Sequence, residues 1–218
     1  DKALAADPKS LDAWLMKGDL ERSMNRLDAA TAAYEKAFDL NPRDVAANMN
    51  MASVAMAAGK FEEARKYVET VHKAAPDSPI GNYLLGLIEF RQRNLKAAND
   101  AVQQVLKRLP NYTPAKALDG AVAYSLGSYD EAEQQLRDVL LLYPNSIYLR
   151  KLLAATLLKE NKAQQSLATL EPLLNEASTM DTNLLVLTAQ AYYQEGEVVK
   201  AKRYFEIAAK KDPRSPKV

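Results

Sequence analysis

The sequence predicts an all-α protein, a solenoid of antiparallel helix pairs stacked one after another. Three observations support this prediction: prolines recur at a fixed spacing of 34 residues, small residues recur at two positions of that period, and a turn-forming residue separates two helical stretches within it. A period of this length indicates a repeat array. The recurring prolines are Pro8, Pro42, Pro76, Pro110 and Pro144, with Pro213 two periods and one residue further on.

Six repeats follow when the proline is counted as the thirty-second residue of each. They span residues 11–44, 45–78, 79–112, 113–146, 147–181 and 182–215, and the fifth is 35 residues long. Residues 1–10 are expected to be the tail of a preceding repeat, and residues 216–218 the start of a further repeat or a tail. We therefore expect a segment of a longer array, whose first and last helices expose apolar surface that associates end to end.

Each repeat is predicted to hold two helices that cross closely, because small side chains let helix backbones approach each other. The eighth residue is small in every repeat: Gly18, Ala52, Gly86, Gly120, Ala154 and Ala189. The twentieth is small as well: Ala30, Ala64, Ala98, Ala132, Ser166 and Ala201. The turn between the helices is expected at the fifteenth residue, which is Asn25, Gly59, Arg93, Gly127, Asn161 or Gly196.

The helix starts are predicted from residues that cap a helix N-terminus. The candidate N-caps are Ser10, Asp44, Ser78, Ser146 and Asp181. Pro79 and Pro114 stand at first-turn positions, where a missing N–H costs nothing.

The fifth repeat departs from the pattern. Ser178 replaces its proline, Ser166 replaces its alanine, and Pro172 falls inside its second helix. Because an internal proline removes a helix hydrogen bond, we expect this helix to be kinked or shortened.

The pattern resembles the tetratricopeptide repeat (TPR), whose signature places Trp or Leu, Gly, Ala, an aromatic residue, Ala and Pro at set positions. The first repeat carries it as Trp14, Gly18, Ala30, Tyr34, Ala37 and Pro42. The last carries it as Ala189, Tyr192, Gly196, Ala201, Phe205, Ala208 and Pro213. The resemblance covers essentially the whole chain. It implies a right-handed superhelix of antiparallel helix pairs with a concave face that binds a protein or a peptide.

In that family the first helix of each repeat lines the concave face, and the corresponding positions here are largely apolar or aromatic from the second repeat onward. The predicted partner-binding residues are Met49, Asn50, Ser53, Met56, Ile80, Tyr83, Leu87, Phe90, Arg91, Tyr124, Ser125, Tyr148, Lys151, Lys159, Gln190 and Tyr193. Aromatic anchors lose little entropy on binding and polar neighbours set the register, so the stripe suits an extended or helical peptide. The alternative is that these side chains only pack between neighbouring first helices. The amount of aromatic area argues against this for the stripe as a whole.

Composition argues against several functions. The chain has 29 Lys and Arg against 28 Asp and Glu, so no strong field attracts nucleic acid or anionic lipid. No apolar run approaches the roughly 20 residues of a membrane span, so this segment is not expected to insert into a membrane. Cysteine is absent and the single histidine, His72, is expected on the surface, which leaves no set of zinc ligands and no Ser–His or Cys–His pair. We expect no catalytic residue, no metal and no cofactor, and a protein that is not an enzyme.

A narrower resemblance covers residues 82–174. This stretch contains NYLLGLIEFRQ, LPNYTPA, DGAVAYSLGSY, LLAAT and LEPLL, and it looks like the TPR-repeat lipoprotein of bacterial PEP-CTERM/exosortase systems. That resemblance implies a periplasm-facing protein of the bacterial cell envelope, with a lipid anchor upstream, linked to protein sorting and exopolysaccharide production. A cytoplasmic location is the alternative.

Three functions remain open at this point. The favoured one is a scaffold that binds a protein or a peptide. The second is an accessory array of a larger enzyme, such as a glycosyltransferase or a polysaccharide-export complex. The third is a structural spacer.

Overall fold

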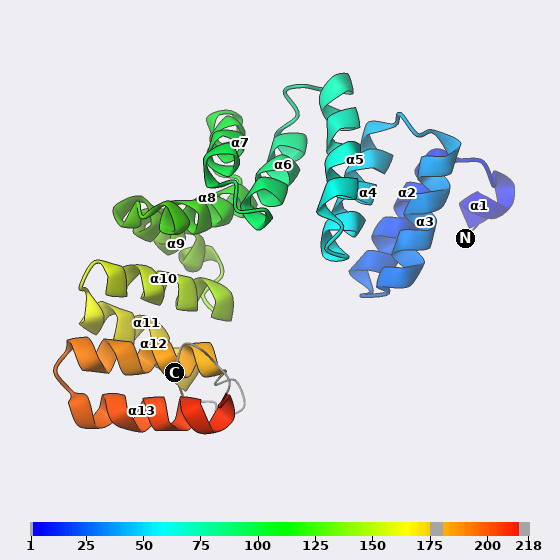
Figure 1. Ribbon diagram of the computed structural model, residues 1–218. Helices are drawn as coiled ribbons and strands as arrows, with labels where there is room; N and C mark the ends of the chain where they lie inside the picture. Colours follow the sequence, from blue (N-terminus) through cyan, green and yellow to red (C-terminus); the bar gives the residue numbers. More distant parts are fainter. Residues whose placement is uncertain (1, 175–180, 214–218) are drawn as a thin grey trace. The chain divides into compact units, whose positions relative to one another are not determined.

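The computed structural model describes residues 2–174 and 181–213, and these residues form helices α1 to α13 and no β-strand (Figure 1). The chain divides into two compact parts, an N-terminal half (Asp1–Tyr112) and a C-terminal half (Thr113–Val218). The N-terminal half holds α1 (Lys2–Ala6), α2 (Leu11–Ser23), α3 (Leu27–Leu40), α4 (Val45–Ala57), α5 (Phe61–Ala74), α6 (Pro79–Arg91) and α7 (Leu95–Arg108). The C-terminal half holds α8 (Thr113–Leu126), α9 (Tyr129–Leu142), α10 (Ile147–Lys159), α11 (Ala163–Leu174), α12 (Thr182–Gln194) and α13 (Val198–Lys211).

From α2 onward the helices form pairs joined by a short turn, and each pair packs on the next pair within its half (Figure 1). The first helices begin at Leu11, Val45, Pro79, Thr113, Ile147 and Thr182, which are the residues at which the sequence pattern begins a repeat. Ahead of the first repeat, Lys2–Ala6 form the short helix α1.

The five predicted N-caps are confirmed. Each side-chain oxygen accepts a hydrogen bond from the backbone N–H three residues further along, at 2.8 Å for Asp44 and Asp181 and at 3.2–3.4 Å for the serines. A cap of this kind stabilises a helix by about 1 kcal/mol. Helix α6 begins with Pro79, and Pro114 lies in the first turn of α8.

The turns inside the pairs are confirmed by their backbone. All six predicted turn residues have a positive φ, between 58° and 85°: Asn25, Gly59, Arg93, Gly127, Asn161 and Gly196. Glycine adopts this conformation without a Cβ penalty, and asparagine tolerates it better than most residues. Arg93 adopts the same conformation in the third repeat, with a φ of 66°.

The two small-residue positions are buried where the helices of a pair cross. Every alanine at these positions is 0–2% exposed. A Cβ added to Gly18 would lie 2.3 Å from Cε1 of Tyr34, and one added to Gly120 would lie 2.8 Å from Cγ of Leu136. The facing side chain on the second helix therefore decides where glycine is required.

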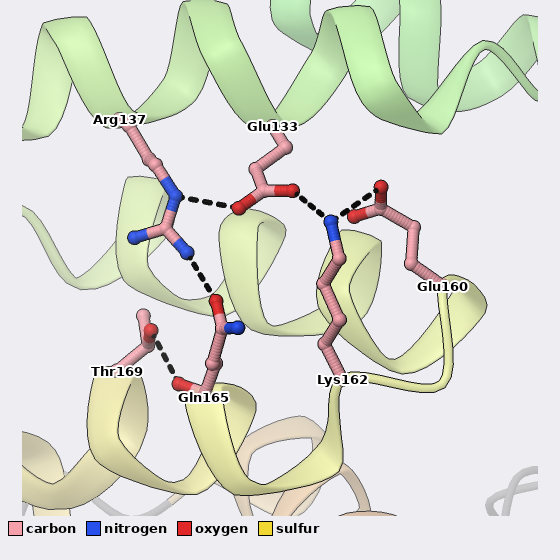
Figure 2. Close-up of polar contacts among 6 residues, drawn as sticks. All are labelled: Glu133, Arg137, Glu160, Lys162, Gln165 and Thr169. Atoms are coloured by element: carbon pink, nitrogen blue, oxygen red, sulfur yellow. Dashed lines mark hydrogen bonds and ion pairs between the residues drawn. The ribbon is translucent and has the colours of Figure 1, made fainter.

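Polar contacts join successive pairs within each half. In the N-terminal half, Arg65 on α5 forms an ion pair of 2.6 Å with Glu89 on α6. In the C-terminal half, Glu133 on α9 accepts hydrogen bonds of 2.6 Å from both Arg137 and Lys162, and Lys162 also pairs with Glu160 at the end of α10 (Figure 2). Pairs two and three and pairs four and five are thus joined by charge as well as by apolar packing.

The fifth repeat keeps its helix pair despite its irregular sequence. Ser166 is fully buried and donates a hydrogen bond of 3.0 Å to the carbonyl oxygen of Ala154, which satisfies a hydroxyl where other repeats have alanine. Helix α11 continues through Pro172 to Leu174. The position of Ser178 lies outside the described residues.

Candidate functional site

The first helices of the C-terminal half, α8, α10 and α12, line an apolar trough. Two adjoining hollows of about 410 and 520 Å³ form it. They share Tyr124, Ala155, Lys159, Leu187 and Gln190, so we treat them as one surface and call it the inner trough. The remaining lining residues are Tyr148, Lys151, Leu152, Leu158, Asn183, Val186, Tyr193, Gln194 and Phe205.

The trough combines a packed base with exposed tyrosine rings. Leu158 is 7% exposed and Val186 is 4% exposed, so both belong to the core and form the base. Tyr148 and Tyr193 are 58% and 65% exposed and offer ring surface to a partner. Tyr124 lies between these extremes, and its ring is 5.9 Å from that of Tyr129. Burial, and to a lesser degree Tyr129, raises the pKa of Tyr124, so its hydroxyl is a neutral hydrogen-bonding group at neutral pH.

The two lysines of the trough differ in their partners. Lys151 Nζ lies 2.5 Å from Oδ2 of Asp181, which also caps α12. Burial acts to raise the pKa of Asp181, but Lys151 and the N–H of Leu184 together hold it below its ordinary value. Lys159 is exposed and forms no ion pair with any carboxylate in the described residues. The trough therefore has one neutralised cation and one cation available to a ligand.

In the N-terminal half the predicted residues separate into three groups. Met49, Met56 and Leu87 are partly buried and pack against a core cluster formed with Ile88 and Val68. These three residues therefore mainly pack between neighbouring helices, which is the alternative considered from the sequence.

Asn50 and Ser53 line a different surface, a hollow of about 430 Å³ whose other walls include Thr31 and Tyr34 of α3. Ser53 donates a hydrogen bond of 2.9 Å to the carbonyl oxygen of Met49 within its own helix. The structure therefore places these two polar residues together beside α3, the second helix of the first repeat.

Tyr83 and Phe90 are half-buried on α6, whereas Ile80 and Arg91 on the same helix are exposed. The Tyr83 ring meets that of Tyr112 edge-on at 5.6 Å, and burial raises the pKa of Tyr83. In the other half, Ser125 donates to the carbonyl oxygen of Ala121 inside α8.

Several trough residues were missing from the sequence prediction. Asn183 and Ala155 occupy the same first-helix positions as predicted residues, so the period itself could have identified them. Phe205 comes from a second helix, where the aromatic position of the repeat indicated only a core residue. Its contribution to the trough depends on how α13 packs on α12.

One sequence expectation about chemistry was wrong. His72 is half-buried on α5, and its Nε2 is shielded from solvent without a hydrogen-bond partner, so it is not a surface imidazole. Within residues 2–174 and 181–213, no three His, Cys, Asp or Glu side chains gather closely enough to hold a metal ion. None of the helices described there is long and apolar enough to cross a bilayer.

Comparison with protein families decides the classification. The family described as the TPR domain of cytochrome c-type biogenesis protein H matches residues 2–116, more than half of the chain. The chain belongs to the tetratricopeptide repeat family. A second tetratricopeptide repeat family matches residues 184–215, in the last TPR.

Curated relatives share part of this TPR array. Human protein O-mannosyl-transferase TMTC1 is 32% identical over 107 residues, which are 47% of this chain and 12% of that protein. The general transcriptional corepressor ssn6 of Schizosaccharomyces pombe is 27% identical over 136 residues, 62% of this chain and 12% of the corepressor. The chain thus spans about one eighth of the length of these relatives.

Solved TPR structures confirm the predicted fold class. Pseudomonas aeruginosa pilF has a TM-score of 0.75 at 15% identity, covering 95% of this chain and 94% of that chain. TTC0263, a thermophilic TPR protein of Thermus thermophilus, has a TM-score of 0.63 at 25% identity, covering 84% and 100%. YrrB, described as a TPR protein with an unusual peptide-binding site, has a TM-score of 0.56 at 20% identity, covering 94% and 96%.

Proposed function

We propose that this TPR array is a non-catalytic scaffold that binds an extended segment of a partner protein in the inner trough. The observation that carries the proposal is the arrangement of two exposed tyrosines, Tyr148 and Tyr193, and of Lys159, a cation with no ion pair among the described residues, around an apolar base. Aromatic side chains of this kind supply contact area at low entropic cost, and a free cation fixes the position of one acidic group on the ligand. Peptide binding by the TPR protein YrrB supports the same use of the fold.

The experiment is a selection of phage-displayed random peptides of about twelve residues against the whole chain, followed by affinity measurement on variants. Peptides of the trough class should bind Tyr148→Ala and Tyr193→Ala at least about tenfold more weakly, because each loses an exposed aromatic anchor. Lys159→Met should reduce binding of those peptides that carry a carboxylate. Tyr143→Ala is the matched control, since Tyr143 is also 56% exposed but does not line the trough.

The affinities of the selected peptides for these variants can either support or refute the inner trough as the binding site. Circular dichroism should show unchanged helicity for the exposed-tyrosine variants. If all selected peptides bind Tyr148→Ala, Tyr193→Ala and Tyr143→Ala equally well, the trough is not the binding site. Phe90→Ala and Tyr83→Ala apply the same test to the predicted residues of the N-terminal half.

A second candidate function is that of an accessory array in a larger glycosyltransferase. The observation that favours it is the 32% identity to protein O-mannosyl-transferase TMTC1, over 107 residues that form a small share of that protein. The full-length sequence tests this candidate: a transferase domain joined to this array supports it, and its absence refutes it.

A more specific proposal is a role in protein sorting and exopolysaccharide production at a bacterial cell envelope. It rests on the resemblance of residues 82–174 to the TPR-repeat lipoprotein of PEP-CTERM/exosortase systems. Under this proposal the full-length protein is held by a lipid anchor and faces the periplasm. Membrane fractionation with and without the upstream segment tests it, and recovery of the full-length protein in the cytoplasmic fraction would refute it.

Association of this segment end to end is proposed from its terminal helices. On α2, Met16 and Leu20 are 72% and 57% exposed, and on α13 Val199 is 84% exposed. Light scattering tests it, since a species that stays monomeric at high protein concentration contradicts association.

A further inference from the structure

A second hollow lies in the C-terminal half, and it shares no residue with the inner trough. It has a volume of about 600 Å³ and runs between the second helices α9 and α11, with the start of α10 as its floor. Its walls are Leu140, Leu141 and Pro144 on one side and Ala168 and Thr169 on the other, with Leu153 beneath. Figure 2 shows three residues of its rim, Arg137, Gln165 and Thr169, next to the Glu133–Lys162 contacts. We call this surface the outer groove.

One wall of the outer groove exposes an apolar side chain at a repeat position that is charged in most other repeats. Leu141 is 81% exposed, and its neighbour Leu142 is 65% exposed. The residues at the position of Leu141 in the sequences of the other five repeats are Asp39, Lys73, Lys107, Asn175 and Lys210. Four of these five are charged and none is apolar, so the exposed leucine marks a local apolar surface rather than a feature of every repeat.

The floor of the groove holds a cation, Arg150, that forms no ion pair with the described residues. Arg150 is half-buried, and its Nε and Nη1 donate hydrogen bonds of 2.8 and 3.0 Å to the carbonyl oxygens of Pro144 and Thr169. No carboxylate of the described residues forms an ion pair with it. Guanidinium groups bind carboxylates through two parallel hydrogen bonds, and Arg150 retains free donors for one.

In the preceding repeat the equivalent cation has a carboxylate partner. Lys116 occupies the position of Arg150 one repeat earlier, and it pairs with Asp138 at 3.0 Å. Asp138 follows Lys116 by 22 residues, and the residue that follows Arg150 by 22 is Pro172. The irregular proline of the fifth repeat therefore stands where the cation of the fourth repeat finds its carboxylate.

Arg137, the other charged side chain that lines the groove, is already paired. Arg137 on the rim donates to Glu133 at 2.6 Å and to Gln165 at 2.7 Å, and Glu133 is shared with Lys162 (Figure 2). Asp138 is held by Lys116. Among the described residues that line the groove, the charge without an ion-pair partner is therefore positive and lies on Arg150.

We propose that the outer groove is a docking site for an apolar segment of a partner protein that carries a carboxylate. A Leu or Phe side chain of the partner enters between Leu140, Leu141 and Leu153, and an Asp or Glu nearby in the partner binds Arg150. Charge complementarity selects the acidic side chain, and the exposed leucines supply the apolar contact. This site is independent of the inner trough, so one array holds two partners or two segments of one partner.

The test uses the whole chain and the same phage-displayed library of random peptides, sorted by variant. We expect a class of peptides with Asp or Glu within a few residues of Leu or Phe that binds Leu141→Lys at least about tenfold more weakly, because that change restores the charge typical of the position. Arg150→Met should weaken the same peptides at least about tenfold, and so should exchanging the peptide's acidic residue for its amide. Lys116→Met is the matched control, because this cation already has a carboxylate partner.

The two sites are distinguished by their variants. Peptides of the outer-groove class should bind Tyr148→Ala as well as the unchanged protein, and trough peptides should bind Leu141→Lys normally. Because Leu141 is mostly exposed, Leu141→Lys tests the site even if Arg150→Met is poorly folded. The proposal is overturned if no peptide loses affinity on Leu141→Lys, or if the peptides that do so lack an acidic residue and ignore Arg150→Met.

Discussion

The carbonyl oxygen of Pro42 accepts a hydrogen bond of 2.9 Å from Nδ2 of Asn48, a residue that is 1% exposed. The same bond recurs with other donors, from Trp14 Nε1 to Pro8 at 2.9 Å and from Arg150 Nε to Pro144 at 2.8 Å. In each case the donor follows the proline by six residues and ties the start of a first helix to the preceding turn. At Pro8, Pro42 and Pro144 the regular proline thus follows the end of a helix and also supplies a hydrogen-bond acceptor, its carbonyl oxygen.

Asn48→Ala should destabilise the protein by about 1–3 kcal/mol, because it removes this bond and a second one of 2.7 Å to the carbonyl oxygen of Asp44. Urea denaturation followed by circular dichroism measures the change. Asn50→Ala is the control on the same helix, since Asn50 is only half-buried and forms no side-chain hydrogen bond with the described residues. An equal loss for both variants would contradict the proposed role of Asn48.

Gly18→Ala should destabilise the first repeat by about 1–3 kcal/mol, because the new Cβ would lie 2.3 Å from the ring of Tyr34. The second repeat supplies the control, since it has Ala52 and Val68 at the equivalent positions. Gly18→Ala combined with Tyr34→Val should therefore be more stable than the sum of the two single changes predicts. A double-mutant cycle of thermal unfolding checks this, and strict additivity would contradict it.

Stability at acid pH should depend on Glu89. The hydrogen bond from Arg65 holds the pKa of Glu89 below its ordinary value, although burial opposes this, and Asn94 assists. Because the folded-state pKa is lowered, the ionised carboxylate stabilises the protein fully above the ordinary Glu pKa of about 4.3, and this contribution is lost as pH falls through the folded-state value.

The free energies of unfolding of the unchanged protein and Glu89→Gln should therefore converge as the pH falls from about 5 through the lowered folded-state pKa of Glu89. Urea denaturation at a series of pH values measures the convergence. Arg65→Met should show the same convergence because it breaks the same pair. If the difference in the free energy of unfolding between the unchanged protein and Glu89→Gln stays constant or grows toward acid pH, the ionised Glu89 does not stabilise the fold in this way.

Tyr34 should ionise late in the folded protein. Burial, followed by the hydrogen bond of 2.8 Å that its hydroxyl donates to Asp19, raises the pKa of Tyr34 to about 12. Since the folded-state pKa is raised, the neutral hydroxyl stabilises the fold below about pH 10, and this contribution is lost as pH rises from there through the folded-state value.

Tyrosinate absorbance measured for the unchanged protein and for Tyr34→Phe isolates this titration by difference. The midpoint of the difference should lie near the raised value, and Asp19→Asn should move it down, because that change removes the nearby negative charge. A difference titration centred near the ordinary tyrosine pKa of about 10 would show that the hydroxyl is not held in this way.

Much of the candidate site could be expected from the repeat period, and part of it could not. The period identified Tyr124, Tyr148, Lys159 and Tyr193, which the structure places along one trough. The period alone gives Leu158 and Tyr193 the same position in their repeats, yet Leu158 lies in the core and Tyr193 is exposed, because exposure depends on which helices pack on either side. The outer groove was not anticipated, because it depends on Arg150 having no carboxylate partner among the described residues rather than on a sequence motif.

The sequence by itself determined the local structure: the fold class, the starts of the helices at their caps, the positive-φ turns and the small residues where helices cross. These features depend on hydrogen bonds and steric limits within a few residues, so they follow from residue type and spacing. Only the tertiary structure decided that Arg65 meets Glu89, that Tyr34 closes over Gly18, and that Lys116 pairs with Asp138 whereas Arg150 has no ion pair among the described residues. These contacts join residues 16 to 24 positions apart in successive or facing helices, and their formation depends on side-chain packing that the repeat pattern alone does not specify.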